Sequence, residues 1–299
     1  MNGAALMTMA WQLVKPGIVA GNLIAVLGGY FLASRGQWYE PRVLLATVLG
    51  TTLVVAGGCV LNNCIDRDID RRMVRTCHRV MALGACPLGL ASVYGVLLAS
   101  LGLVVLQRCC NDLAAALAGL GLLFYVGFYS LWFKRRSLYG TPVGSLAGAM
   151  PPVIGYCAVS AHFDAPAFWL LVMFCCWQIP HAHAIAQYRR EDLRAAGLPI
   201  LTMARGQRQI VIGILAFVLS AVVLGLSSAM SMAWFLVIGG LGSCWLAVAL
   251  ARPGHGEGRR WARRIFGWSI ILVLASSLMM STAHPGLSLD AGGTPALGG

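Results

Sequence analysis

Nine apolar segments dominate this chain of 299 residues. They cover residues 17–34, 43–63, 88–107, 112–133, 140–160, 165–187, 209–229, 231–250 and 265–283. A helix rises about 1.5 Å per residue, so each segment is long enough to cross roughly 30 Å of hydrocarbon. Because 59% of the residues are hydrophobic and only 11% are charged, a soluble domain is excluded. We therefore expect an all-α membrane protein with nine transmembrane helices.

The basic residues are distributed unevenly between the two ends of these segments. If successive spans alternate in direction, all but three of the 22 Lys and Arg residues fall on one side, the exceptions being Arg35, Arg42 and Arg108. The positive-inside rule then predicts an integral protein of the bacterial cytoplasmic (inner) membrane, with its N-terminus and basic loops in the cytoplasm and its C-terminus outside. The net charge of +12 is accounted for in this way, and no nucleic-acid partner is predicted.

The chain is expected to form one polytopic membrane domain over residues 1–284. Residues 285–299 are rich in Gly, Pro and Ser, which predicts a disordered C-terminal tail. Shifting the sequence by 126 positions places Gly29 on Gly155 and Asp66 on Asp192. This offset predicts a four-plus-four helical repeat, in which two polar loops face one central cavity.

The most unusual polar segment spans residues 62–70 and holds three of the ten carboxylates in the chain. Charge at the edge of a membrane is costly and indicates a function. Asn62, Asp66 and Asp70 are spaced i, i+4 and i+8, which would align three oxygen donors on one face of a helix. Such donors suit a hard divalent cation, so we predict an Mg²⁺ site here. Asp68 lies on another face, which favours either a salt bridge or a supporting contact behind the metal ligands.

Basic residues accompany the predicted metal site. Arg67, Arg71 and Arg75 repeat the same spacing one residue later, and Arg side chains bind phosphate oxygens well. This stripe predicts a phosphate-bearing substrate, although an ordinary charged loop would also collect arginines. Lys134 and Arg135 end the fourth apolar segment, where diphosphate binding and a positive-inside anchor explain them equally well.

A second polar segment lies within the sixth apolar run. Gln178 and His181 are spaced i, i+3 and can share a helix face, which predicts that they line a cavity. Hydrogen bonding between helices is the alternative. His183 lies two residues from His181 and points away from it, so a two-histidine metal site is not expected.

These patterns resemble the intramembrane UbiA-type prenyltransferase superfamily, whose first signature is Asn-x-x-x-Asp followed by a further Asp. More specifically, the chain is similar to the haem O synthase (protohaem IX farnesyltransferase) family. The likeness runs through most of residues 14–205. It is carried by residues 15–17, 21–22, 62–72, 75–79, 134–141, 144–156, 177–181 and 196–199.

The resemblance implies Mg²⁺-dependent transfer of a farnesyl group from farnesyl diphosphate to a vinyl group of haem B, with addition of water, giving haem O. It implies that Asn62, Asp66, Asp70 and Asp192 are the catalytic metal ligands. Diphosphate would be bound by the basic residues Arg67, Arg71, Arg75, Lys134 and Arg135. We further predict that His181, with Gln178, contacts haem, as an axial ligand or as a partner of a propionate.

Two features refine the resemblance, and two alternatives remain open. Ala196 stands where the wider superfamily usually has a second acid four residues after Asp192, which favours the haem branch. Leu193 departs from the Tyr that this branch often has. The alternatives are a prenyltransferase acting on an aromatic quinone precursor and, in another class, a secondary transporter for an anionic substrate. A haem-O-using enzyme or a terminal oxidase assembly is a predicted downstream partner.

Overall fold

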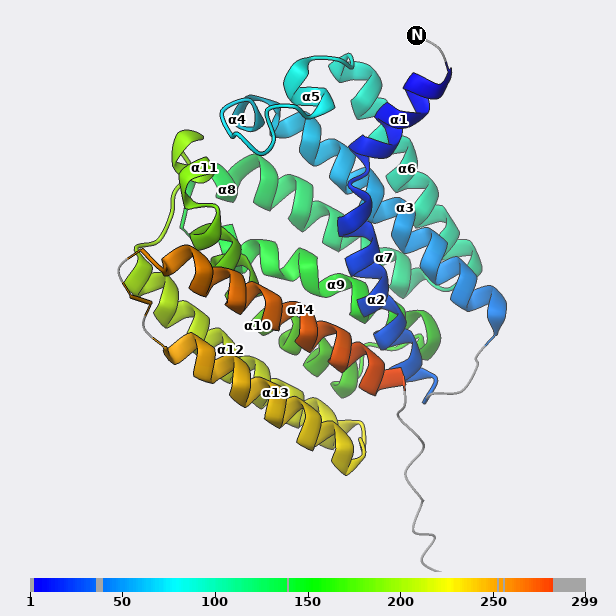
Figure 1. Cartoon of the computed structure of the whole chain (residues 1–299). Helices are drawn as coiled ribbons and strands as arrows, with labels where there is room; N and C mark the ends of the chain where they lie inside the picture. The colour runs from blue at the N-terminus through cyan, green and yellow to red at the C-terminus, as the bar shows by residue number, and fades with distance from the viewer. Residues whose placement is uncertain (1–2, 36–39, 139, 252, 255, 282–299) are drawn as a thin grey trace, which may run out of the picture.

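The computed structural model describes residues 3–35, 40–138, 140–251, 253–254 and 256–281, and within these residues it is helical, without strands. Nine described segments are long and apolar enough to cross a membrane, which confirms the predicted all-α architecture (Figure 1). They are α2 (Pro16–Ala33), α3 (Pro41–Ile65), α6 (Leu88–Cys109), the continuous segment Asp112–Arg136, α9 (Gly140–Ser160), α10 (Ala165–Tyr188), α12 (Met203–Ser227), α13 (Met232–Leu250) and α14 (Gly258–Ser281). The predicted tail, residues 285–299, lies outside the described residues.

The short helices gather at one end of this bundle (Figure 1). They are α1 (Gly3–Leu13), α4 (Arg67–Asp70), α5 (Val80–Leu83), α8 (Lys134–Arg136) and α11 (Arg190–Ala195). The last described helix, α14, ends at the opposite end of the bundle. The polar loops therefore share one side, as the distribution of basic residues predicts.

The helices α2 and α9 meet backbone to backbone. A Cβ atom on Gly29 would lie 1.8 Å from the carbonyl oxygen of Pro152, and one on Gly155 would lie 2.1 Å from that of Val26. Glycine permits this approach, as it does between other membrane helices. The offset of 126 residues relates Gly29 to Gly155 and Val26 to Pro152, so the contact is reciprocal, as a two-fold repeat would require. One contact does not establish the repeat, which stays a prediction.

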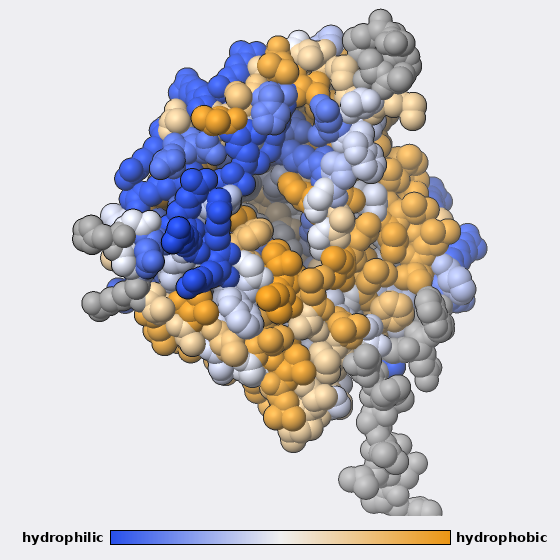
Figure 2. Space-filling view, in the orientation of Figure 1, coloured by the Kyte–Doolittle hydropathy of each residue, from blue (hydrophilic) through white to orange (hydrophobic). Residues whose placement is uncertain are grey.

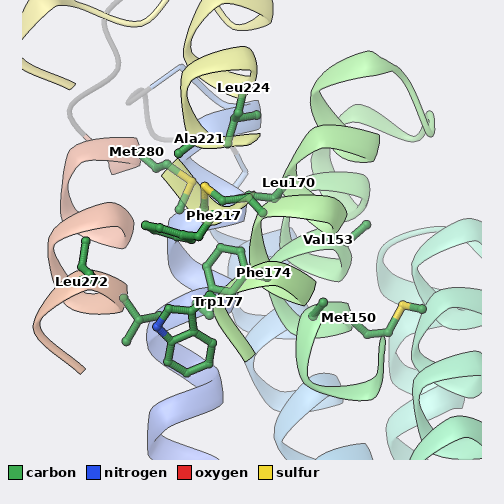
Figure 3. Close-up of a cluster of buried hydrophobic side chains, with 14 of the residues drawn as sticks. Met150, Val153, Leu170, Phe174, Trp177, Phe217, Ala221, Leu224, Leu272 and Met280 are labelled. Carbon is green, nitrogen blue, oxygen red and sulfur yellow. The ribbon is translucent and has the colours of Figure 1, made fainter. Parts of the chain in front are cut away.

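A cluster of large apolar side chains joins α10 to α12 and α14. Figure 3 shows Phe174 and Trp177 of α10 together with Phe217 of α12 and Leu272 of α14. The indole Nε1 of Trp177 donates a hydrogen bond of 2.8 Å to the carbonyl of Ser269 on α14. Because lipid tails are as apolar as these side chains, close packing and such hydrogen bonds hold the helices together.

The bundle is hollowed on the face that carries α2 and α14 (Figure 2). Hydrophilic residues gather on the side of the hollow near α4 and α11, and hydrophobic residues predominate below the hollow in this view. A cavity with one polar wall and apolar surroundings suits a ligand that has a charged end and an apolar body.

Candidate active site

The Asp-rich segment forms a helix end rather than one regular helix. Helix α3 stops at Ile65, Asp66 occupies the cap position with φ −84° and ψ 1°, and the four-residue helix α4 follows. The backbone bonds from Asp66 N to Asn62 O and from Asp70 N to Asp66 O preserve the i, i+4 relation. The backbone relation that underlies the predicted donor face is therefore kept from Asn62 to Asp70, whereas the predicted helix does not continue beyond Asp70.

The helix can end here because arginine side chains satisfy its last carbonyls. Arg67 Nη1 donates to Cys64 O at 2.9 Å, and Arg135 Nη2 donates to Ile65 O at 2.7 Å. Beyond Asp70 the chain turns, and Arg71 Nε donates to the carbonyl of Ala82 in α5 at 2.7 Å. The predicted stripe of Arg67, Arg71 and Arg75 is consequently not a single helical face.

Asn62 and Asp66 form the buried centre of the site. Asn62 Nδ2 donates to Asp66 Oδ2 at 2.8 Å, while Lys15 Nζ donates to Asn62 Oδ1 at 2.6 Å. Lys134 Nζ forms an ion pair with Asp66 Oδ2. Asp66 is only 1% exposed, and a buried carboxylate of this kind requires cationic partners. Burial lowers the pKa of Lys15 to about 8, so most of this lysine stays protonated at neutral pH.

The fourth span shapes the opposite wall of this centre. Its second half, η1 (Leu123–Phe133), is a π-helix, a rare form that often occurs at functional sites. Ser130 of this helix is fully buried and donates to the carbonyl of Tyr125 at 2.7 Å. Asn62 Nδ2 in turn donates to Ser130 Oγ at 3.0 Å. The π-helix continues directly into Lys134 and so positions this side chain beside Asp66.

Asp70 forms a second, separate ion pair. Arg79 Nη1 donates to both carboxylate oxygens of Asp70, at 3.1 and 2.9 Å. Thr76 Oγ1 donates to the carbonyl of Asp70 at 3.1 Å and closes the intervening turn. Asp70 is 4% exposed and Thr76 is fully buried, so this loop is held from inside rather than lying free on the surface.

The two polar loops contact each other directly, a contact that the predicted four-plus-four repeat does not by itself require. The backbone N–H of Val74 donates to Asp192 Oδ1 at 3.1 Å, and α4 and α11 lie side by side (Figure 1). Ile69 and Met73 of the first loop pack against Ala196 of the second. Burial lowers the pKa of the Arg75 guanidinium, while Asp70 and Asp192 act in the opposite direction. Arg75 therefore lies within electrostatic reach of the acids of both loops.

The remaining charged residues of the segment lie toward the outside. Arg135 forms two hydrogen bonds of 2.7 Å with the carboxylate of Asp68, confirming the predicted salt bridge there. This pairing lowers the pKa of Asp68 to about 2. Arg135 Nη2 is also 3.9 Å from Asp66 Oδ1. Arg67 and Arg71 are exposed, and among the described residues neither forms an ion pair.

The predicted metal ligands offer one free oxygen to a divalent cation, but their side chains do not form one ready cluster. Asp66 Oδ1 is buried and has no hydrogen-bond partner, so one oxygen remains available for a ligand. Within the described part of the chain, no three His, Cys, Asp or Glu side chains lie together as a ready cation site. Asn62 and Asp66, the Asp70–Arg79 pair and Asp192 are instead three neighbouring groups, each held by cationic or backbone N–H donors.

The predicted haem contacts lie on α10. His181 Nδ1 lies 2.8 Å from Ser269 Oγ of α14, and its ring stacks on Trp177 with centroids 4.6 Å apart. Gln178 packs against α9, because a Cβ on Gly148 would lie 2.8 Å from its Cδ. Both side chains are partly exposed. His181 therefore forms a hydrogen bond between helices through Nδ1, which is the alternative to lining a cavity.

The sequence patterns assign no role to three residues of this site, which are Lys15, Arg79 and Ser130. Lys15 has a left-handed backbone, with φ 53°, immediately before the proline that starts α2. Such strain in a residue other than glycine is often found at functional sites. The signal available in the sequence is an isolated lysine placed directly before a proline and a long apolar run.

Known proteins resemble this chain in sequence over most of its length. The profile of the UbiA prenyltransferase family matches residues 22–271. Protoheme IX farnesyltransferase 2 of Pseudomonas aeruginosa (strain UCBPP-PA14) is 54% identical over 271 residues, which cover 89% of this chain and 91% of that protein. The protein of the same name from Pseudomonas entomophila (strain L48) is 51% identical over 274 residues, covering 90% and 92%.

Solved structures share the fold at low sequence identity. A structure concerning digeranylgeranylglyceryl phosphate synthase in membranes has a TM-score of 0.72 and 15% identity, over 93% of this chain and 98% of that one. A UbiA homolog from Archaeoglobus fulgidus bound to GPP and Mg²⁺ has a TM-score of 0.62 and 14% identity, over 92% and 99%. The chain is thus an integral membrane protein that belongs to the UbiA prenyltransferase family.

Proposed function

We propose that this protein transfers a farnesyl group from farnesyl diphosphate to a vinyl group of haem B, with addition of water, giving haem O. The observation that carries the proposal is its 50–54% identity, over about nine tenths of both chains, to proteins named protoheme IX farnesyltransferase. The buried cations and carboxylates at the polar end of the hollow support it. A prenyl diphosphate has the charged head and apolar tail that such a site accommodates.

The leaving group determines what the charged residues must do. Breaking the allylic C–O bond leaves the electron pair on diphosphate, and Lys134, Lys15 and Arg79 lie where they can stabilise that charge. Arg75 can contribute from the loop between the acids, whereas Arg67, Arg71 and Arg135 serve first as donors to helix carbonyls or to Asp68. The geometry thus favours Lys134 and Arg75 among the five predicted basic ligands.

Magnesium is the proposed cofactor. Asn62, Asp66, Asp70 and Asp192 would hold it, and when bound it would neutralise diphosphate oxygens that lysines alone leave partly charged. The free Asp66 Oδ1 supports this assignment, and so does the presence of Mg²⁺ with GPP in the fold relative from Archaeoglobus fulgidus.

The acceptor completes the reaction. The vinyl carbon of haem B bonds to C1 of the farnesyl group, and water then adds a hydroxyl to the neighbouring carbon and releases a proton. The apolar farnesyl tail and porphyrin body can lie among the helices at little cost. His181, with Gln178, is the proposed haem contact. Because Ser269 engages Nδ1 of His181, Nε2 is the nitrogen left to meet haem.

Purified protein incubated with farnesyl diphosphate, haem B and Mg²⁺ is expected to yield a product whose mass equals that of haem B plus a farnesyl group and a hydroxyl group. EDTA is expected to abolish the product, and added Mg²⁺ to restore it, because the carboxylates cannot themselves neutralise diphosphate. Mass spectrometry of the extracted porphyrin measures both results. Product from 4-hydroxybenzoate but not from haem B would instead favour the quinone-type alternative, and family membership already argues against a transporter.

Replacing His181 by Ala is expected to weaken haem binding by about tenfold, because the substitution removes the ring nitrogen that faces the proposed haem site. Titration of the purified variant with haem, followed by visible absorption, measures the change. The matched control is His162→Ala, since His162 is an exposed loop residue between α9 and α10. Equal affinities of the wild type and His181→Ala would remove His181 from the proposed haem site.

Orientation and partners extend the same proposal. The polar loops, α1 and the acidic site would face the cytoplasm of a bacterial inner membrane, where farnesyl diphosphate is soluble and accessible, with the C-terminus outside. A haem-O-using enzyme or terminal oxidase assembly would take the product, because haem O is apolar and would leave through the bilayer.

A further inference from the structure

A groove separate from the acidic site opens at the same end of the bundle. It has a volume of about 660 Å³, and its polar lining includes Arg67, Asp68, Arg135 and Arg136. Helices α3 and α4 contribute one wall, α6 another, and η1 with α8 the third. None of the four predicted metal ligands lines it, so it opens beside the acidic centre and not into it, although Arg67, Asp68 and Arg135 border both.

The charge in this groove is positive and only partly compensated. Its one carboxylate, Asp68, is held by both terminal nitrogens of Arg135. Arg136 lies 5.6 Å from the ring centroid of Trp132, and Arg67 is exposed. Among the described residues, neither Arg67 nor Arg136 forms an ion pair. Arg67 uses Nη1 for the carbonyl of Cys64, so its remaining guanidinium nitrogens, together with the guanidinium of Arg136, are what the groove offers an anion.

The other side of the groove is apolar and open. Leu88 at the start of α6 is 42% exposed, and Leu131 of η1 is 58% exposed. Further along the same helices, Val96 and Phe128 are also exposed. Because these helices are membrane spans, their exposed apolar surface faces acyl chains. Trp132, 60% exposed beside Arg136, is the kind of aromatic residue that lies at the headgroup level.

From this arrangement we infer that the groove binds an anionic phospholipid, with its phosphate between Arg67 and Arg136 and its acyl chains along α6 and η1. Basic pockets between membrane helices recognise anionic headgroups in this manner. A zwitterionic lipid would place its ammonium group among three guanidinium groups, which disfavours it. Arg135 is bonded to Asp68 in the groove and also lies 3.9 Å from Asp66 in the acidic site. The side chain of Arg135 therefore separates the bound headgroup from the acidic site.

The test is lipid binding by the purified full-length protein, measured by native mass spectrometry with phosphatidylglycerol and phosphatidylcholine of identical acyl chains. Phosphatidylglycerol is expected to bind at least about tenfold more tightly. The double variant Arg67→Gln/Arg136→Gln is expected to lose that preference, whereas Arg67→Lys/Arg136→Lys should keep most of it. The matched control is Arg260→Gln/Arg264→Gln, which removes two exposed charges from the same end of the bundle, outside the groove.

Three results would overturn the inference. One is equal binding of the two lipids by the wild-type protein. Another is an equal loss of preference in the Arg260→Gln/Arg264→Gln control, which would indicate general surface charge. The third is displacement of phosphatidylglycerol by inorganic phosphate, or by farnesyl diphosphate without metal, at equal concentration, because either would assign the groove to a soluble phosphate or to the substrate. Failure of the farnesyl-transfer assay would not affect these readouts.

Discussion

Replacing Asp66 by Asn is expected to lower farnesyl transfer by about 10³-fold or more while leaving the fold intact. Asp66 is the buried acid with one carboxylate oxygen free for a ligand, and its other oxygen receives Lys134 and Asn62. The amide keeps the size of the side chain and one oxygen, so Lys134 retains an acceptor. It lacks the negative charge that holds a cation against diphosphate. Initial rates at saturating farnesyl diphosphate and haem B measure the loss.

The control for this variant is Asp68→Asn, the same substitution two residues away. The Asp68 side chain is 53% exposed, and among the described residues its carboxylate forms an ion pair with Arg135 alone. Exposed ion pairs contribute little to stability. Its activity is expected to stay within a few fold of the wild type, and both variants should elute and unfold like the wild type. Substantial transfer by Asp66→Asn would refute the metal role of Asp66. If the variant is unfolded, the buried Lys134 requires the negative charge of Asp66 for folding.

The membrane spans could be predicted because each is an apolar run whose length matches a bilayer. The predicted positions of the helix ends are less accurate than the predicted spans. The seventh run was predicted from residue 209 and the ninth from residue 265, yet α12 begins at Met203 and α14 at Gly258. The added residues include arginines, since a helix continues past the hydrocarbon with its charged side chains in water, where hydropathy no longer identifies it.

The site could be predicted in part for a similar reason. The spacing of Asn62 and Asp66 is local, so a helical repeat is enough to bring them together. Lys15 and Asn62 are 47 residues apart, and Ser130 and Asn62 are 68 apart. Those contacts depend on how α2 and the π-helix pack against α3. The change to a π-helix, which determines where Ser130 and Lys134 point, follows from that packing and not from any periodicity in the sequence.

Replacing Gly29 by Ala is expected to cost about 3 kcal/mol or more of stability, because the added methyl group meets backbone rather than a movable side chain. Its position is 1.8 Å from the carbonyl oxygen of Pro152, so α2 and α9 must separate to admit it. Gly155→Ala should cause a comparable loss, since its Cβ would lie 2.1 Å from the carbonyl oxygen of Val26. Thermal unfolding of the purified variants in detergent measures both.

The matched control lies in the same helix. A Cβ on Gly21 would have no neighbour within 4 Å, so Gly21→Ala should be neutral or gain up to about 1 kcal/mol from helix propensity. The double variant Gly29→Ala/Gly155→Ala should lose less than the sum of the two single losses, because one separation of α2 from α9 relieves both clashes. A strictly additive loss would mean that the two glycines act independently, and an unchanged midpoint for Gly29→Ala would contradict the backbone contact itself.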